Sequence, residues 1–167
     1  MGLKRAFVIG LCLAAVAAVV MLAAVIIRPP KIYISEICPS NSETSKKTAM
    51  QDKNGEPSDW IEIYNPTNKD ISLTGFSLSK NGGGDQPLGG YVIKAHDYII
   101  VYCSSAGFEN ADFPHADFSI GKVSEAEIIL KYDSLQCESI KLPKLNKGVS
   151  YSKNVKGEMY VSEPTPL

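Results

Sequence analysis

Histidines limit the catalytic chemistry open to this chain, because it has only two. A Ser-His-Asp or Cys-His arrangement would have to use His96 or His115. His115 lies near Asp112 and Asp117, but in a Pro-bearing loop without the strand–turn–helix context that presents a nucleophile. We interpret His115 as a surface residue and predict that the chain has no catalytic residue and is not an enzyme.

Carboxylates offer a second kind of chemistry, centred on residues 59–65 (DWIEIYN). Paired carboxylates could serve a glycosidase, with Glu62 as one of the pair. The alternative, which we favour, is a partly buried Glu62 that accepts hydrogen bonds from the amides of a neighbouring loop. Trp60 could be a platform on which a sugar stacks. We expect it to fill the core instead, where a large aromatic buries about 150–250 Å².

A calcium site is a third possibility, because Asp52, Asn54, Glu56 and Asp59 lie close together in the sequence and all carry oxygen ligands. An EF-hand loop has its glycine at the sixth position, whereas Gly55 would occupy the fourth. A turn accounts for these residues, so we predict no metal ion and no cofactor.

The elements that position these side chains are expected to be β-strands. Residues 59–65 alternate strictly, with Trp60 and Glu62 on one face and Ile61 and Ile63 on the other. Both rows are largely apolar. We therefore expect a central strand whose second face is covered by a loop.

The chain before this strand supplies the expected cover. Residues 31–38 (KIYISEIC) read as a strand with Ile32 and Ile34 on one face and Ile37 on the other. The polar segment 39–58 that follows has no apolar period. We expect it to be a long exposed loop whose amides reach the glutamate of the central strand.

Short alternating segments continue to the end of the sequence, separated by turns that contain Gly, Pro or Asn. Asp133 and Ser134 are the expected two-residue connection of a hairpin. The clearest further segments are 76–80, 97–103, 125–132, 135–142, 149–153 and 158–161. No helical period appears after residue 28. About eight or nine short strands with a turn every 8–12 residues or so indicate a β-sandwich or a barrel.

Several motifs in this strand pattern resemble the lamin-tail domain family, especially its bacterial members. That family has a strand ending in NEI, then GE and DWIEL with a following Asn, and then a hydrophobic-x-L-x-G-hydrophobic-x-L-S stretch. The resemblance covers about residues 32–167, although Ser35 stands where Asn is usual and SEPTPL stands for the closing PTPG. The matching residues are Glu36, Ile37, Gly55, Glu56, Asp59, Trp60, Ile61, Glu62, Asn65, Leu73, Gly75, Leu78 and Ser79.

The resemblance implies an all-β, immunoglobulin-like β-sandwich over residues 31–167 and a non-catalytic binding role. We expect the motif residues to be structural rather than catalytic or ligand-binding. These are Glu36, Gly55, Glu56, Asp59, Trp60, Glu62, Asn65 and Gly75.

An apolar run without a charged side chain, residues 6–27, stands apart from the β pattern. As a helix it would span about 33 Å at ~1.5 Å per residue, enough for a hydrocarbon core of about 30 Å. Lys4 and Arg5 precede the run and favour a cytoplasmic N-terminus. We predict that residues 1–28 are a short cytoplasmic segment and a transmembrane helix. The alternative is a cleaved signal peptide, which would make the protein secreted.

Charge and cysteine content narrow the partners and the compartment. All 18 acidic side chains follow residue 28, whereas three of the 17 basic ones, Lys4, Arg5 and Arg28, do not. The part of the chain after residue 28 therefore has a net charge of about −4. A nucleic-acid-binding domain would be cationic. Cys38, Cys103 and Cys137 permit one disulfide and one free thiol, but we favour three small buried hydrophobic residues.

Together these features predict a non-catalytic module outside the cell, tethered to the cell membrane. We expect it to bind an extracellular protein or a cell-surface polysaccharide and no nucleic acid. The alternative is the anchored, non-catalytic portion of a surface or spore-coat enzyme whose catalytic module is downstream or on a separate chain.

Overall fold

The structure is a computed structural model that describes residues 28–41, 57–104, 113–121 and 125–166. The chain divides into two compact units, Met1–Pro30 and Lys31–Leu167, and all strands belong to the second. The strands are β1 (Tyr33–Cys38), β2 (Asp59–Tyr64), β3 (Ile71–Ser72), β4 (Phe76–Lys80), β5 (Gln86–Pro87), β6 (Val92–Ile93), β7 (Tyr98–Cys103), β8 (His115–Ala116), β9 (Glu127–Tyr132), β10 (Leu135–Lys141), β11 (Ser150–Lys153) and β12 (Met159–Ser162).

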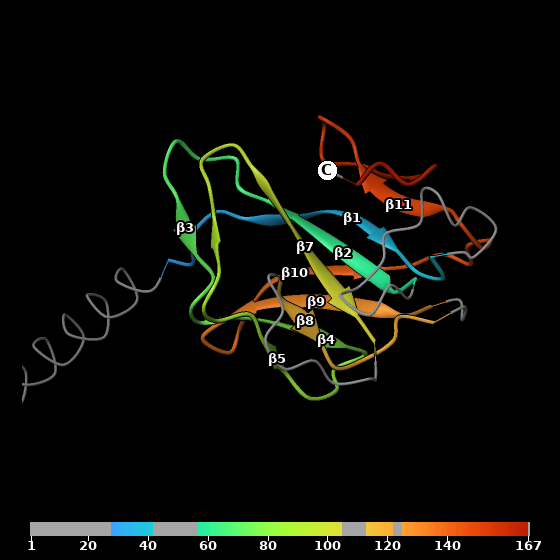
Figure 1. Ribbon diagram of the computed structural model, residues 1–167, viewed down its shortest axis with the longest axis horizontal. Coiled ribbons are helices and arrows are strands. Elements are labelled where there is room, and N and C mark those ends of the chain that lie inside the picture. Colours follow the sequence, from blue (N-terminus) through green and yellow to red (C-terminus); the bar gives the residue numbers. More distant parts are fainter. Residues whose placement is uncertain (1–27, 42–56, 105–112, 122–124, 167) are drawn as a thin grey trace, which may run out of the picture. The chain divides into compact units, whose positions relative to one another are not determined.

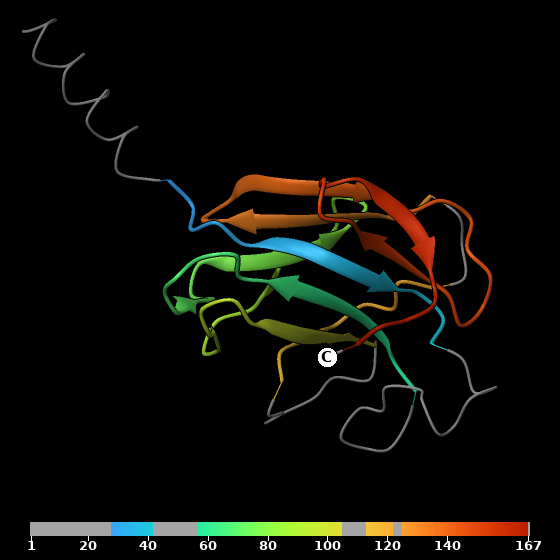
Figure 2. The ribbon, with the colours of Figure 1, turned by 90° about the horizontal axis from the view of Figure 1, so that it is seen from above.

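The strands form three sheets. A six-stranded sheet has the order β12-β11-β1-β2-β7-β8, a four-stranded sheet has the order β10-β9-β4-β5, and β3 pairs with β6. Neighbouring strands are antiparallel except β7 and β8, which are parallel. Strands β2 and β7 run obliquely to β9 and β10 (Figure 1), and Figure 2 shows the same strands from above.

This architecture confirms the predicted all-β fold. The predicted number of strands was too low: the described residues form twelve, and four of them, β3, β5, β6 and β8, are only two residues long. A two-residue strand is too short to show an alternating pattern, so its pairing with a neighbour cannot be read from the sequence.

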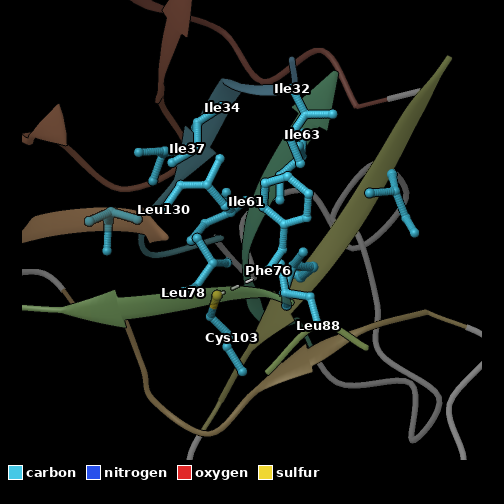
Figure 3. Close-up of a cluster of buried hydrophobic side chains, with 14 of the residues drawn as sticks. Ile32, Ile34, Ile37, Ile61, Ile63, Phe76, Leu78, Leu88, Cys103 and Leu130 are labelled. Carbon is cyan, nitrogen blue, oxygen red and sulfur yellow. Dashed lines mark hydrogen bonds between the residues drawn. The ribbon is translucent and has the colours of Figure 1, made fainter. Parts of the chain in front are cut away.

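The core lies between the six-stranded and the four-stranded sheet (Figure 3). The large sheet contributes isoleucines from β1 and β2, and the small sheet contributes apolar side chains from β4 and β9. Each such side chain contributes about 1.5–3 kcal/mol when fully buried. The fully buried members include Ile34, Ile37, Ile61, Ile63, Phe76, Leu78, Leu88 and Leu130.

Strand β1 differs from its predicted alternation. Ile34 and Ile37 both lie in the core, although an unbroken strand would put them on opposite faces. The register between β1 and β2 shifts between Ile34 and Glu36, so Ser35 is an extra residue in a β-bulge. The prediction that Ile37 faces away from Ile34 was therefore wrong.

The predicted hairpin between β9 and β10 is confirmed. Asp133 and Ser134 have φ angles of 45° and 70°, as both central residues of a type I′ turn require. The N–H of Asp133 donates to the carbonyl of Gly75, at 2.9 Å, which fastens this hairpin to the turn before β4.

The predicted transmembrane segment, residues 6–27, lies outside the described residues. Within the described ranges no helix has the length and apolar character needed to cross a membrane.

Gly75 is expected to be needed for stability. Its φ is 86°, and a Cβ at this position would lie 2.8 Å from Asp133 Oδ1 and 3.1 Å from Tyr132 Cε2. We expect Gly75→Ala to lower the free energy of unfolding by about 1–3 kcal/mol, because a side chain in this region of φ is strained. Gly89→Ala is the matched control, since its Cβ would meet nothing within 4 Å. Urea unfolding measures both variants, and equal stability of the two would contradict the expectation.

Candidate functional site

Strand β2 lies between β1 and β7 and is buried on both faces. Its inner face carries Ile61 and Ile63, which belong to the core between the sheets. Its other face, called the outer face below, is the side of the six-stranded sheet that points away from the four-stranded sheet. There Trp60 is fully buried, as predicted. It packs in a second apolar cluster with Cys38, Ile100 and Tyr102.

Two motif glutamates lie side by side on the outer face. Glu36 of β1 and Glu62 of β2 are register partners and are only 3% and 4% exposed. The hydroxyl of Ser35, the bulged residue, donates to Glu62 Oε1 at 2.6 Å. Glu62 is thus a buried, hydrogen-bonded carboxylate. The loop predicted to cover Glu62 comprises residues 39–58, and most of it, residues 42–56, lies outside the described residues.

The partner of Glu36 comes from the far end of the chain. The backbone N–H and the hydroxyl of Thr165 donate to its two carboxylate oxygens, at 3.0 and 2.8 Å. The segment that follows β12 is therefore held against β1, on the outer face. These two bonds join positions 129 residues apart in the sequence.

Asp59, the first residue of β2, binds two loops. Its Oδ1 accepts from the N–H of Ser40 at 2.7 Å, and its Oδ2 accepts from Ser119 Oγ and the N–H of Gly121, both at 2.9 Å. Protein donors thus occupy both oxygens. The other oxygen ligands of the calcium alternative are Asp52, Asn54 and Glu56. They lie outside the described residues, as does the motif residue Gly55.

Asn65, directly after β2, is fully buried and closes the following turn. Its side-chain amide donates to the carbonyls of Lys69 at 2.7 Å and Lys94 at 2.8 Å. Its side-chain oxygen accepts from the N–H and the hydroxyl of Thr67, at 3.0 and 2.7 Å. An Asn in this geometry replaces backbone partners that an irregular turn cannot supply.

A row of tyrosines crosses the outer face at the other end of β2, and the pattern within a single strand does not reveal it. Tyr33, Tyr64 and Tyr98 are successive register partners on β1, β2 and β7. The ring centroids of Tyr33 and Tyr64 are 5.5 Å apart, and those of Tyr64 and Tyr98 are 4.4 Å apart. Tyr98 is exposed. We call these three residues the tyrosine row.

Tyr33 and Tyr98, the two ends of the tyrosine row, both have a raised pKa. Burial, followed by the neighbouring Tyr64, raises the pKa of Tyr33 above its ordinary value. Burial, followed by the carboxylate of Glu62, raises the pKa of Tyr98 in the same direction. The ammonium group of Lys153 lies 4.7 Å from the centre of the Tyr33 ring.

Lys153 takes part in a contact between the two sheets that the sequence alone does not predict either. It forms an ion pair with Glu138 of β10. The other oxygen of Glu138 accepts from the N–H of Ile34 in β1 at 2.8 Å. Both partners adjoin a bulge: Glu138 follows the register shift at Cys137 in β10, and Ile34 precedes the bulge at Ser35 in β1.

His115 lies within hydrogen-bonding distance of a serine hydroxyl, as the histidine of a catalytic Ser-His pair does. It lies in β8 and not in a loop, so that prediction was wrong, and its Nε2 is 3.0 Å from Ser104 Oγ. The N–H of Ser104 donates to the carbonyl of Ala116 at 3.2 Å, so this amide pairs the two strand ends and is not free to stabilise an oxyanion. His96 contacts Asn68 Oδ1 at 2.6 Å in an exposed turn.

The three cysteines after residue 30 are free thiols, but only two of them are buried, whereas burial of all three was favoured. Cys38 and Cys103 are buried, whereas Cys137 is only partly covered. Burial raises the pKa of Cys38 to about 12. Both buried thiols therefore behave as small apolar side chains.

Truncating Trp60 should remove much of the stability of the domain. Trp60→Ala is expected to cost about 3–5 kcal/mol, the usual loss for a buried large aromatic, out of the ~5–15 kcal/mol available to an ordinary domain. Trp60→Phe is the control, because it keeps most of the packing and should lose less. Chemical denaturation measures both. If Trp60→Ala unfolds at the wild-type denaturant concentration, the side chain does not stabilise the outer face.

Comparison with known proteins identifies the family of this chain. The family model for the Lamin Tail Domain matches residues 28–141, which is more than half of the chain and reaches from β1 to the end of β10. No curated protein matches the sequence. Lamin tail domains are a non-catalytic family with an immunoglobulin-like fold, and this chain belongs to that family.

Proposed function

We propose that this protein is a non-catalytic binding or scaffold module, tethered by residues 6–27 to the outer side of the cell membrane. Its partner would be an extracellular protein or a cell-surface polysaccharide. The tether rests on the uncharged apolar run at the N-terminus and on the basic residues Lys4 and Arg5 before it.

One observation carries the non-catalytic part of the proposal. Of the described motif carboxylates, Glu36 and Glu62 are buried and Asp59 is partly buried. Each is bonded within the fold: Glu36 to Thr165, Glu62 to Ser35, and Asp59 to Ser40. A catalytic acid or base must reach a substrate with its reacting atom. Side chains that fasten strands and loops to each other serve stability instead.

The tyrosine row supports a binding role for the surface. Tyrosine combines a large apolar ring with a hydroxyl, and it is enriched in interfaces for that reason. The row contains no acidic or basic side chain, and Lys153 beside it is paired with Glu138. Such a surface suits an uncharged, hydrogen-bonding partner. The net charge of about −4 on the domain disfavours nucleic acid.

Site-directed labelling in intact cells tests the topology. Val155, in the turn between β11 and β12, is fully exposed, so Val155→Cys should react with a membrane-impermeant maleimide. Lys4→Cys is the matched control and should react only after the membrane is opened. Both are made with Cys137→Ser, because Cys137 is only partly covered. Labelling of Val155→Cys only after the membrane is opened would contradict the outward orientation. A mature N-terminus beyond residue 27 would contradict the membrane tether but not the outward orientation.

A binding comparison tests the tyrosine row. The full chain, Tyr98→Ala and the control Val92→Ala are immobilised and exposed to a panel of wall polysaccharides and extracellular proteins. Val92 is exposed like Tyr98 but lies on β6, outside the row. We expect Tyr98→Ala to bind at least about tenfold less of the retained partner, as for an aromatic residue at the centre of an interface. Equal binding by all three proteins would place the interface elsewhere.

A further inference from the structure

Edge strands expose backbone groups that can pair with another strand, so a fold normally blunts them. The strands at the edges of the two larger sheets are β8, β5, β10 and β12. The first two have only two residues each, and β5 includes Pro87. Strand β10 has a bulge at Cys137 and the paired charge of Glu138. These three edges are protected by length, by proline or by a bulge.

Strand β12 lacks these devices. Its four residues, Met159–Ser162 (MYVS), include no charged residue and no proline, and its register with β11 is regular. Tyr160 is 48% exposed and Val161 is 55% exposed, although both are large and apolar. In the described part of the chain, no strand pairs with β12 on its free side.

The hydrogen bonds of the hairpin show which backbone groups of β12 point outward. The N–H of Asn154 donates to the carbonyl of Glu158, which marks this pair as hydrogen-bonded. Pairs alternate along an antiparallel ladder. Ser152 with Tyr160 and Ser150 with Ser162 are therefore hydrogen-bonded pairs. It follows that the N–H and C=O groups of Met159 and Val161 point away from the sheet, at its free edge.

The chain leaves this edge after β12. Thr165 binds Glu36 on β1, two strands further into the sheet, so residues 163–166 turn over the outer face. This end of the chain does not occupy the position next to β12. Among the described residues, nothing pairs with the edge formed by Met159 and Val161, so a strand from another molecule can do so.

We infer that β12 pairs antiparallel with β12 of a second copy of this chain, about a two-fold axis at Tyr160. This register sets Met159 opposite Val161 of the second copy, and Val161 opposite its Met159. Both outward-pointing residues of each strand thus form hydrogen-bonded pairs. Tyr160 faces its own counterpart at the axis, with the aromatic rings on the outer face.

Charge and hydrogen-bonding pattern favour this register over its neighbour. With the axis at Tyr160, Glu158 lies opposite Ser162 and Glu163 lies opposite Gly157 of the second copy, so no like charges meet. With the axis between Tyr160 and Val161, Glu158 would lie opposite Glu163, and the outward groups of one strand would meet inward groups of the other. The edge is therefore self-complementary in the register with the axis at Tyr160, as an interface with two-fold symmetry must be.

Disulfide trapping tests the pairing in the purified full chain, in detergent and over a range of protein concentrations. Tyr160 and its counterpart would form a pair without mutual hydrogen bonds, whose Cα atoms lie about 4.5 Å apart, within the range of ~4.4–6.8 Å that a disulfide spans. Tyr160→Cys is made with Cys12→Ala and Cys137→Ser, which leaves only the buried Cys38 and Cys103. On mild oxidation we expect a covalent dimer.

Val155→Cys in the same background is the matched control. Val155 is more exposed than Tyr160, at 106%, but lies in the turn beyond the paired region. Tyr160→Cys should form the covalent dimer at least about tenfold faster than Val155→Cys. The reason is that strand pairing holds the two thiols together and so raises their effective concentration. Adding Val161→Lys, which charges the edge, should abolish this advantage. Adding Val155→Lys should not.

Trp60 fluorescence reports whether each variant is folded, since Trp60 is the one tryptophan and is fully buried. Equal dimer formation by folded Tyr160→Cys and Val155→Cys would overturn the proposal, because random collision would then explain both. A Tyr160→Cys dimer that persists with Val161→Lys would overturn the proposed register.

Discussion

Strand β2 is buried on both faces, and this constraint governs the outer side of the large sheet. A central strand in a two-layer sandwich usually has one face toward the core and one toward solvent. Here the second face carries Trp60, which must be packed, and Glu62, which must be hydrogen-bonded. A buried polar group without a partner costs about 1–3 kcal/mol. The sequence therefore needs donors from neighbouring segments beside every polar residue of this strand.

Those donors explain why distant parts of the chain meet at β2 and its neighbour β1. The bulge at Ser35 brings a hydroxyl to Glu62, and the end of the chain brings Thr165 to Glu36. The start of β2 receives the loops at Ser40 and Gly121 through Asp59. Strands β11 and β12 lie beyond the range that matches the family model, yet β11 pairs with β1 and so continues the sheet. The motif thus supplies the hydrogen-bond acceptors, and residues elsewhere in the sequence supply their donors.

Regular alternation and turn chemistry made much of this fold predictable. The central strand, the burial of Trp60 and the hairpin at Asp133 and Ser134 follow from patterns of a few neighbouring residues. The bulge at Ser35 was not predictable, because one extra residue leaves the local composition unchanged and only the partner strand reveals it. The tyrosine row and the link from Glu138 to β1 depend on register between strands, which a single strand does not encode.

The same constraint shifts the possible sites of function toward the margins of the sheet. Side chains near the middle of β2 are committed to packing and hydrogen bonds, so changing them alters stability before it alters recognition. The ends of the strands are less constrained. Tyr98 is exposed at one end of the tyrosine row, and no strand in the described part of the chain pairs with the outward backbone groups of Met159 and Val161 in β12. A partner that stacks on the row and a second copy that extends the sheet would use different atoms. This scaffold can therefore vary either contact without disturbing the bonded interior on which its stability depends.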